Sequence, residues 1–271
     1  FAYLLNNPKQ VRAMSPETRS ELERVLKRSD NELAAKYSRL VGLERIQAML
    51  VSTEYQFYDR ERGGGLWCGK HYGIDAPRIG DPINDHSHAA TVRQCLRYFL
   101  MLEQDRLGGP EISARLRELF AAPWLELHDD GFVRGLKGRP VDVLRKNGLW
   151  EDWHLDVARV SHAGRVYLLA GMVHHAKGPD YLARVAAGID DRLVNDPARL
   201  PFRHELLLHD VNKHFNGTIT NGRLEPARAG VELSPRAGSD AVYESRAIET
   251  LGKFNELLLS WNVATPRETG F

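Results

Sequence analysis

Apolar side chains recur every three to four positions through most of the first fifty residues, which is the spacing of one buried face on an α-helix. Ser15-Pro16-Glu17 offers a capping hydroxyl, a proline for the first helical position and an acid for the first turn. The helix that it opens is predicted to end near Arg28. Further helices are predicted over residues 31–40 and after Gly42.

The helical pattern stops between Glu54 and His88, where glycine and proline are frequent. This stretch is predicted to be a long irregular segment, and segments of this length in compact domains usually carry function. Helical spacing returns over residues 91–107 and again over residues 110–120. Two more helices are therefore expected.

The spacing then changes to that of β-strands. Strands are predicted over residues 141–144, 153–160 and 166–174, with Ala163-Gly164 as the turn of a hairpin. Helical spacing over residues 179–194 predicts a closing helix. This order of elements predicts an α+β fold, in which helices cover a sheet.

Turn signals and short β-like pieces alternate after residue 197. We expect a domain over residues 1–197 and a β-rich carboxyl-terminal appendage over residues 198–271, with a structural or interaction role. Its predicted strands cover residues 230–233, 241–245 and 254–261.

Composition excludes several classes of protein. The 271 residues are 42% hydrophobic and 27% charged, as in ordinary globular domains. The net charge of +1 gives no overall attraction for nucleic acid or anionic lipid, so we expect no nucleic-acid partner. The longest clear apolar run, residues 166–173, is far shorter than the ~20 residues of a transmembrane helix. Cys68 and Cys95 are too few for a disulfide framework.

Two tripeptides carry the candidate chemistry. Ser29-Asp30-Asn31 lies between two predicted helices, where alone it reads as a helix cap. Lys146-Asn147-Gly148 lies at the predicted strands, where alone it reads as a turn. In this order and on these elements, the pair resembles the Ser-Asp-Asn and Lys-Thr-Gly motifs of class A β-lactamases and penicillin-binding proteins. The resemblance extends to residues 87–107, 144–160 and 178–190.

The resemblance implies a β-lactamase/transpeptidase-like antiparallel sheet with a helical subdomain, and catalytic roles for Ser29 and Lys146. Ser29 would relay a proton, and Lys146 would order Ser29 and attract a substrate carboxylate. Asn31, Asn147 and Gly148 would line the substrate site, and the Leu149 amide would form half of an oxyanion hole. Asp30 and Asp156 would support the site, the latter as a buried acid.

Two departures from the family pattern matter. No Ser-x-x-Lys occurs in the sequence, so the family's nucleophile motif is missing. The run from Phe1 to Leu5 resembles the later turns of the helix that carries this motif, which would place the serine and lysine before residue 1. Secondly, Glu54 and Glu61 are the only glutamates between Glu54 and His88, and neither matches the family's deacylating base.

The irregular segment and the tryptophans offer further candidates. Lys70 or Tyr72 would contact substrate at the rim of the cleft, while Trp67 reads more simply as an anchor of the segment on the core. Trp150 and Trp153 would form a cleft wall or pack in the core.

No metal or cofactor is expected. The histidine pairs at residues 86 and 88 and at residues 174 and 175 have no third ligand at motif spacing. His204-Glu205 followed by His209 is one residue too long for the HExxH metal motif.

The function implied by the resemblance is that of a serine hydrolase acting through an acyl-enzyme on β-lactams or related amides and esters. D,D-peptidase and esterase activities on the same fold remain alternatives, as does a non-catalytic binding or scaffold protein. The implied partner is a small-molecule or peptidoglycan-derived substrate, and the implied location is extracytoplasmic.

Overall fold

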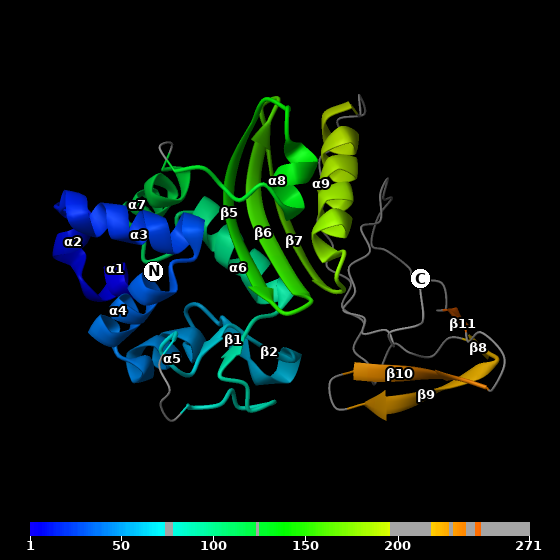
Figure 1. The fold of residues 1–271 in the computed structure, drawn as a ribbon. Helices are drawn as coiled ribbons and strands as arrows, with labels where there is room; N and C mark the ends of the chain where they lie inside the picture. Colours follow the sequence, from blue (N-terminus) through cyan, green and yellow to red (C-terminus); the bar gives the residue numbers. More distant parts are fainter. Residues whose placement is uncertain (74–77, 123–124, 196–217, 228–229, 237–241, 245–271) are drawn as a thin grey trace. The chain divides into compact units, whose positions relative to one another are not determined.

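Helices occupy most of the first fifty residues, as their hydrophobic spacing predicts. The computed structural model describes residues 1–73, 78–122, 125–195, 218–227, 230–236 and 242–244 (Figure 1). The Ser15 hydroxyl accepts a hydrogen bond from the Thr18 amide at 3.1 Å, which confirms the predicted cap. The helices here are α1 (Ala2–Asn6), α2 (Pro8–Arg12), α3 (Pro16–Arg28), α4 (Asn31–Val41) and α5 (Leu43–Val51).

The stretch from Glu54 to His88 is irregular, as predicted, and is held by side-chain hydrogen bonds. The Tyr58 hydroxyl donates to the buried carboxylate of Asp81 at 2.6 Å. The Trp67 indole is buried and donates to the Ile79 carbonyl at 2.8 Å, which confirms the anchoring interpretation of Trp67. Its short elements are β1 (Tyr58–Asp59), a 3-10 turn (Arg60–Arg62), β2 (Gly64–Gly65), β3 (Trp67–Cys68) and β4 (His88–Ala89).

Three helices follow this stretch. They are α6 (Val92–Glu103), α7 (Pro110–Ala121) and α8 (Gly131–Leu136). The predicted end of α6 at residue 107 is wrong, and α8 was not predicted. Gly135 of α8 lies so close to α9 (Gly178–Asn195) that an added Cβ would be 2.0 Å from the Ala183 carbonyl oxygen. Only glycine permits this contact, which brings α8 against α9.

The main sheet is antiparallel, with strand order β5-β6-β7 and β5 at its edge. Its strands are β5 (Val141–Trp150), β6 (Trp153–His162) and β7 (Arg165–His174). The turn at Ala163-Gly164 has positive φ angles of 49° and 75°, as the tight hairpin requires. Strand β5 is longer than the predicted residues 141–144, and it contains Lys146-Asn147-Gly148, so the tripeptide lies on the edge strand, as the motif resemblance implies.

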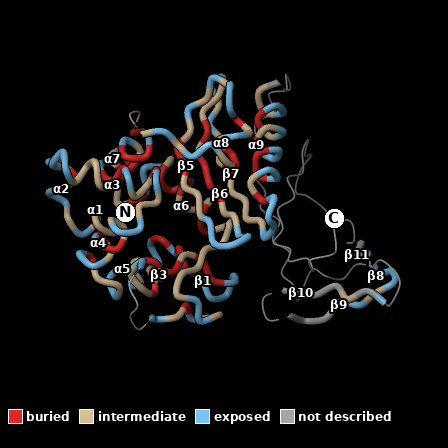
Figure 2. Tube along the Cα trace, in the orientation of Figure 1, coloured by how far each residue is buried: buried red, intermediate tan, exposed pale blue. Residues whose placement is uncertain are grey.

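Helices cover both faces of this sheet, which confirms the predicted α+β fold (Figures 1 and 2). One face carries Leu144 and Val157 into the core formed with α3, α6 and α7. The opposite face carries Ala158 and Val160 into a smaller core with α8 and α9. Since side chains alternate between the faces of a strand, neighbouring residues of β5 belong to different cores.

A buried ion pair joins β5, β6 and α8. Arg145 is 3% exposed and Asp156 is 1% exposed. The Arg145 Nε donates to Asp156 Oδ1 and its Nη2 donates to Oδ2, both at 2.6 Å. The Phe132 amide, in the first turn of α8, donates to the same carboxylate at 2.8 Å. Asp156 is therefore a buried acid, as the family resemblance implies.

A second compact unit contains β8 (Thr218–Thr220), β9 (Gly222–Ala227), β10 (Gly230–Pro235) and β11 (Val242–Glu244). Strand β10 pairs with β9, and β11 pairs with β8, all antiparallel. Two of the three predicted strands are thus confirmed. The strand predicted over residues 254–261, the boundary near residue 197 and the His204–His209 motif lie outside the described residues. Among the helices of the described part, none is long and apolar enough to cross a bilayer.

Replacing Asp156 by alanine should lower the free energy of unfolding by about 3–5 kcal/mol, because Arg145 would be left as a buried charge without its main partner. Urea denaturation measures this change. The matched control is Asp129→Ala, which removes only the exposed ion pair with Lys137 and should cost no more than about 1 kcal/mol. Equal small losses in both variants would contradict a structural role for the buried pair.

Candidate active site

Ser29 lies in the short link between α3 and α4, in an unusual backbone conformation. Its φ and ψ angles of 53° and 41° are left-handed, which costs a residue other than glycine about 1 kcal/mol. Asp30 fixes the link, because its carboxylate accepts hydrogen bonds from the Leu33 amide at 3.0 Å and the Arg24 guanidinium at 2.6 Å. Asp30 thus caps α4, and the link holds the Ser29 hydroxyl in place.

Lys146 reaches this hydroxyl from the edge strand of the sheet. Its Nζ donates a hydrogen bond to Ser29 Oγ, across 117 positions of sequence, and a second one to the Asn147 carbonyl at 2.6 Å. Lys146 lies on the sheet face that carries Leu144 and Val157 toward the helices. The structure therefore brings the two predicted catalytic residues into direct contact.

The surroundings of Lys146 favour its neutral amine. Burial and, to a smaller extent, the positive charge of Arg145 lower the pKa of Lys146 from its ordinary 10.5 to about 8, while the negative charge of Asp156 opposes the shift. Near neutral pH the side chain is still mostly an ammonium ion, which can attract a carboxylate. At slightly alkaline pH a large fraction can accept a proton.

The other residues of the Lys146 motif are divided between the two sheet faces. Asn147 pairs with Asp156 across the strands and therefore lies on the face of α8, away from Lys146. Gly148 shares the face of Lys146, and an added Cβ there would lie 3.6 Å from Leu155. Leu149 and Trp150 are 69% and 68% exposed at the end of β5.

Asn31 and Lys70 are not joined to the Ser29–Lys146 contact by any hydrogen bond or ion pair of the described residues. Asn31 is exposed at the start of α4. Lys70 is half-buried. Burial of the His88 imidazole lowers the pKa of His88, and the positive charge of Lys70 lowers this pKa as well. Substrate contacts by Asn31 and Lys70 stay predictions.

Sequence reasoning missed Arg145 as a member of this site. Arg145 is adjacent to Lys146 in β5, so its charge acts on Lys146 while its side chain binds Asp156 and Asp130 on the opposite face. The sequence does contain a signal for Arg145, which is the succession of two cations within a strand. A charged side chain on a covered face of a sheet requires a buried partner.

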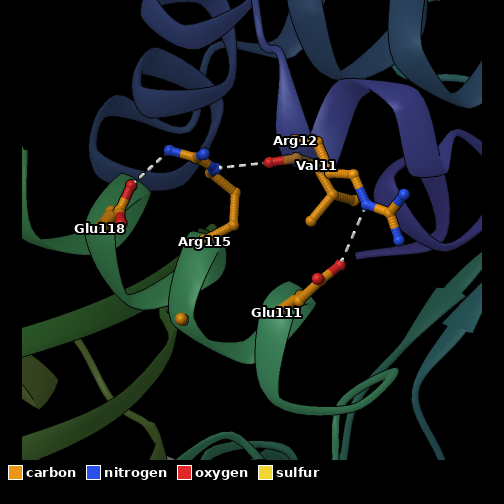
Figure 3. A pocket seen from close by; sticks show the side chains of 6 residues that line it. Val11, Arg12, Glu111, Arg115 and Glu118 are labelled. Atoms are coloured by element: carbon orange, nitrogen blue, oxygen red, sulfur yellow. Dashed lines mark hydrogen bonds and ion pairs between the residues drawn. The ribbon is translucent and has the colours of Figure 1, made fainter.

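A pocket of about 340 Å³ lies elsewhere, between α2 and α7 (Figure 3). Both arginines of this pocket bind neighbouring protein groups. Arg115 donates a hydrogen bond to the Val11 carbonyl at 3.1 Å and forms an ion pair with Glu118 at 2.5 Å. Arg12 forms an ion pair with Glu111 at 3.5 Å. This pocket contains neither Ser29 nor Lys146. Within the described ranges, no group of three or more His, Cys, Asp or Glu side chains could hold a metal ion.

Comparison with known proteins gives fold neighbours only. No protein-family model and no curated protein matches the sequence. Among solved structures, a β-lactamase from Sphaerobacter thermophilus is 14% identical with a TM-score of 0.49, and PBP-A is 16% identical with a TM-score of 0.48. Each match covers 65% of this chain and 62% of the other chain.

A β-lactamase from Streptosporangium roseum is 18% identical with a TM-score of 0.48, and the match covers 69% of this chain and 68% of that one. The chain thus spans less than two thirds of the length of the first two structures. At these identities and scores, the matches assign no family, substrate or residue role to this chain.

The Lys146 amine should titrate with a midpoint near pH 8 in side-chain NMR spectra, with its signal identified by absence from the Lys146→Arg spectrum. At pH values between this midpoint and the higher pKa of lysine in the unfolded chain, the unfolded chain binds more protons than the folded protein. Stability should therefore rise with pH in this window, and the rise should be missing in Lys146→Met. A midpoint above about pH 10 would contradict the proposed environment.

Proposed function

We propose that this protein is a β-lactamase-like serine hydrolase that acts through an acyl-enzyme on β-lactams or related amides and esters. The observation that carries the proposal is the hydrogen bond from Lys146 to Ser29, which joins a strained interhelical link to the edge strand of a sheet. In both position and chemistry, this contact matches what the motif pair implies.

Lys146 and Ser29 would move the proton during acyl transfer. When a serine oxygen attacks the substrate carbonyl, its proton passes through the Ser29 hydroxyl and the Lys146 amine to the leaving nitrogen or oxygen as the amide or ester bond breaks. The lowered pKa of Lys146 suits this exchange, because the amine can both accept and return a proton near pH 8. The ammonium form would bind a substrate carboxylate.

The substrate class follows from this chemistry and is part of the proposal. Lys146 favours a carbonyl compound that also carries a carboxylate, as β-lactams and peptidoglycan stem peptides do. A D,D-peptidase or an esterase would use the same contact. Such substrates imply an extracytoplasmic location.

A second candidate function is binding without catalysis. It is favoured by the absence of any Ser-x-x-Lys from the 271 residues, since the family's attacking serine comes from that motif. In this case the Ser29–Lys146 contact would hold a carboxylate ligand and transfer no proton.

Incubating the full-length protein with a fluorescent penicillin should give a covalent adduct, detected by gel fluorescence and located by mass spectrometry. Ser29→Ala and Lys146→Ala should each slow its formation by about 10²-fold or more, because each removes a proton-transfer group. The wild-type rate should rise as pH increases toward 8, in step with deprotonation of Lys146.

The matched control is Lys137→Ala, which removes an exposed lysine and should label at the wild-type rate. Saturable binding of the penicillin without an adduct would support the non-catalytic alternative. Turnover of small esters without labelling would identify an esterase. Absence of binding, labelling and ester turnover would overturn the proposal.

A further inference from the structure

Three ring-bearing side chains form one row across the end of the main sheet. Trp150 pairs with Trp153 across β5 and β6, and Trp153 pairs with His174 across β6 and β7. Directly paired residues of an antiparallel sheet share a face, so the row lies on the same face as Lys146. The rings of Trp153 and His174 stack 4.3 Å apart at an interplanar angle of 4°.

This row is exposed although indoles are normally buried. Trp150 is 68% exposed and Trp153 is 37% exposed. A group of exposed ring side chains commonly marks a binding surface. We therefore call Trp150, Trp153 and His174 the aromatic row.

The backbone under the row is rigid. A two-residue turn, Glu151-Asp152, joins β5 to β6, with Glu151 in the left-handed conformation at φ 51°. The Asp152 carbonyl accepts a hydrogen bond from the His175 amide at 2.8 Å, which ties this turn to the end of β7. The backbone that carries the rings is thus fixed before any ligand arrives, and the Trp153 ring is also held by its stacking on His174, which reduces the entropy lost on binding.

The charges beside the row restrict the ligand. Glu151 and Asp152 are both exposed at the turn. Two carboxylates disfavour anionic ligands such as nucleic acid or anionic lipid, but they accept hydrogen bonds readily from neutral hydroxyl groups. Aromatic rings next to carboxylates suit a ligand that has flat C–H surfaces and hydroxyl groups around its edge.

We propose that the aromatic row is a binding site for a neutral oligosaccharide of pyranose rings with equatorial hydroxyls, with one ring stacked on the Trp150 indole. Equatorial substituents leave the two faces of such a ring apolar, so they pack on an indole, while the ring hydroxyls donate to Glu151 and Asp152. The proposal concerns binding only and does not depend on catalysis at Ser29.

The residue of β5 between the row and Lys146 on their shared face, Gly148, has no side chain. Gly148 lies between Lys146 and Trp150 on the same face, and among the residues that the structure describes, an added Cβ there would have just two atoms within 4 Å, both of Leu155. No side chain of β5 therefore separates a ligand on the row from Lys146. This arrangement would place a saccharide beside the reaction centre of the proposed hydrolase.

Titration of the full-length protein with chitotetraose and with cellotetraose, followed by calorimetry and tryptophan fluorescence, tests the site. We expect saturable binding of at least one sugar, weakened about tenfold or more in Trp150→Ala and largely retained in Trp150→Phe, which keeps a ring. Val185→Ala is the matched control, because it removes an exposed apolar side chain of α9 and should not change the affinity.

Absence of binding to either sugar up to about 10 mM would overturn the proposal, as would equal affinities of the wild type and a Trp150→Ala variant with an unchanged circular dichroism spectrum. Weakening by Val185→Ala to the same degree as by Trp150→Ala would also overturn it. Since the readout is binding without turnover, failure of the penicillin-labelling experiment leaves this test intact.

Discussion

The buried pair of Arg145 and Asp156 is the interaction on which the rest of the site depends. It closes the gap between β5, β6 and the first turn of α8 with three hydrogen bonds to one carboxylate. Such a pair is costly to desolvate, so its value lies less in stability than in fixing one arrangement of these elements. Because Lys146 follows Arg145 directly, the same pair sets where the lysine leaves the sheet.

Because side chains alternate between the faces of a strand, the two neighbouring cations of β5, Arg145 and Lys146, lie in different environments. Arg145 points into one core and Lys146 into the other, so two cations share adjacent backbone positions without sharing a partner. The arginine is neutralised by carboxylates, whereas the lysine faces a serine hydroxyl and a backbone carbonyl. Because of this difference, Lys146 rather than Arg145 is the cation that can exchange a proton near neutral pH.

Sequence patterns predicted most helices and the β6–β7 hairpin because their signals are local: caps, periodicity and a tight turn. They missed the second half of β5, since Lys146-Asn147-Gly148 on its own favours a turn and pairing with β6 overrides that preference, as the motif resemblance implies. They also failed for α8, whose six residues include two glycines and form a helix only against α9 and Asp156. The contact of Ser29 with Lys146 was predictable from motifs, whereas the influence of Arg145 required three-dimensional neighbours.

The close approach of Gly135 to Ala183 links a remote backbone contact to the chemistry of the lysine. A larger residue at this position would push α8 from α9, draw the Phe132 amide from Asp156 and leave that carboxylate less firmly bound to Arg145. Each of these displacements would change the electrostatic potential at the Lys146 amine, because Arg145 and Asp156 both act on it. The proton affinity of one amine thus depends on a glycine in the other core, which has no contact with the amine itself.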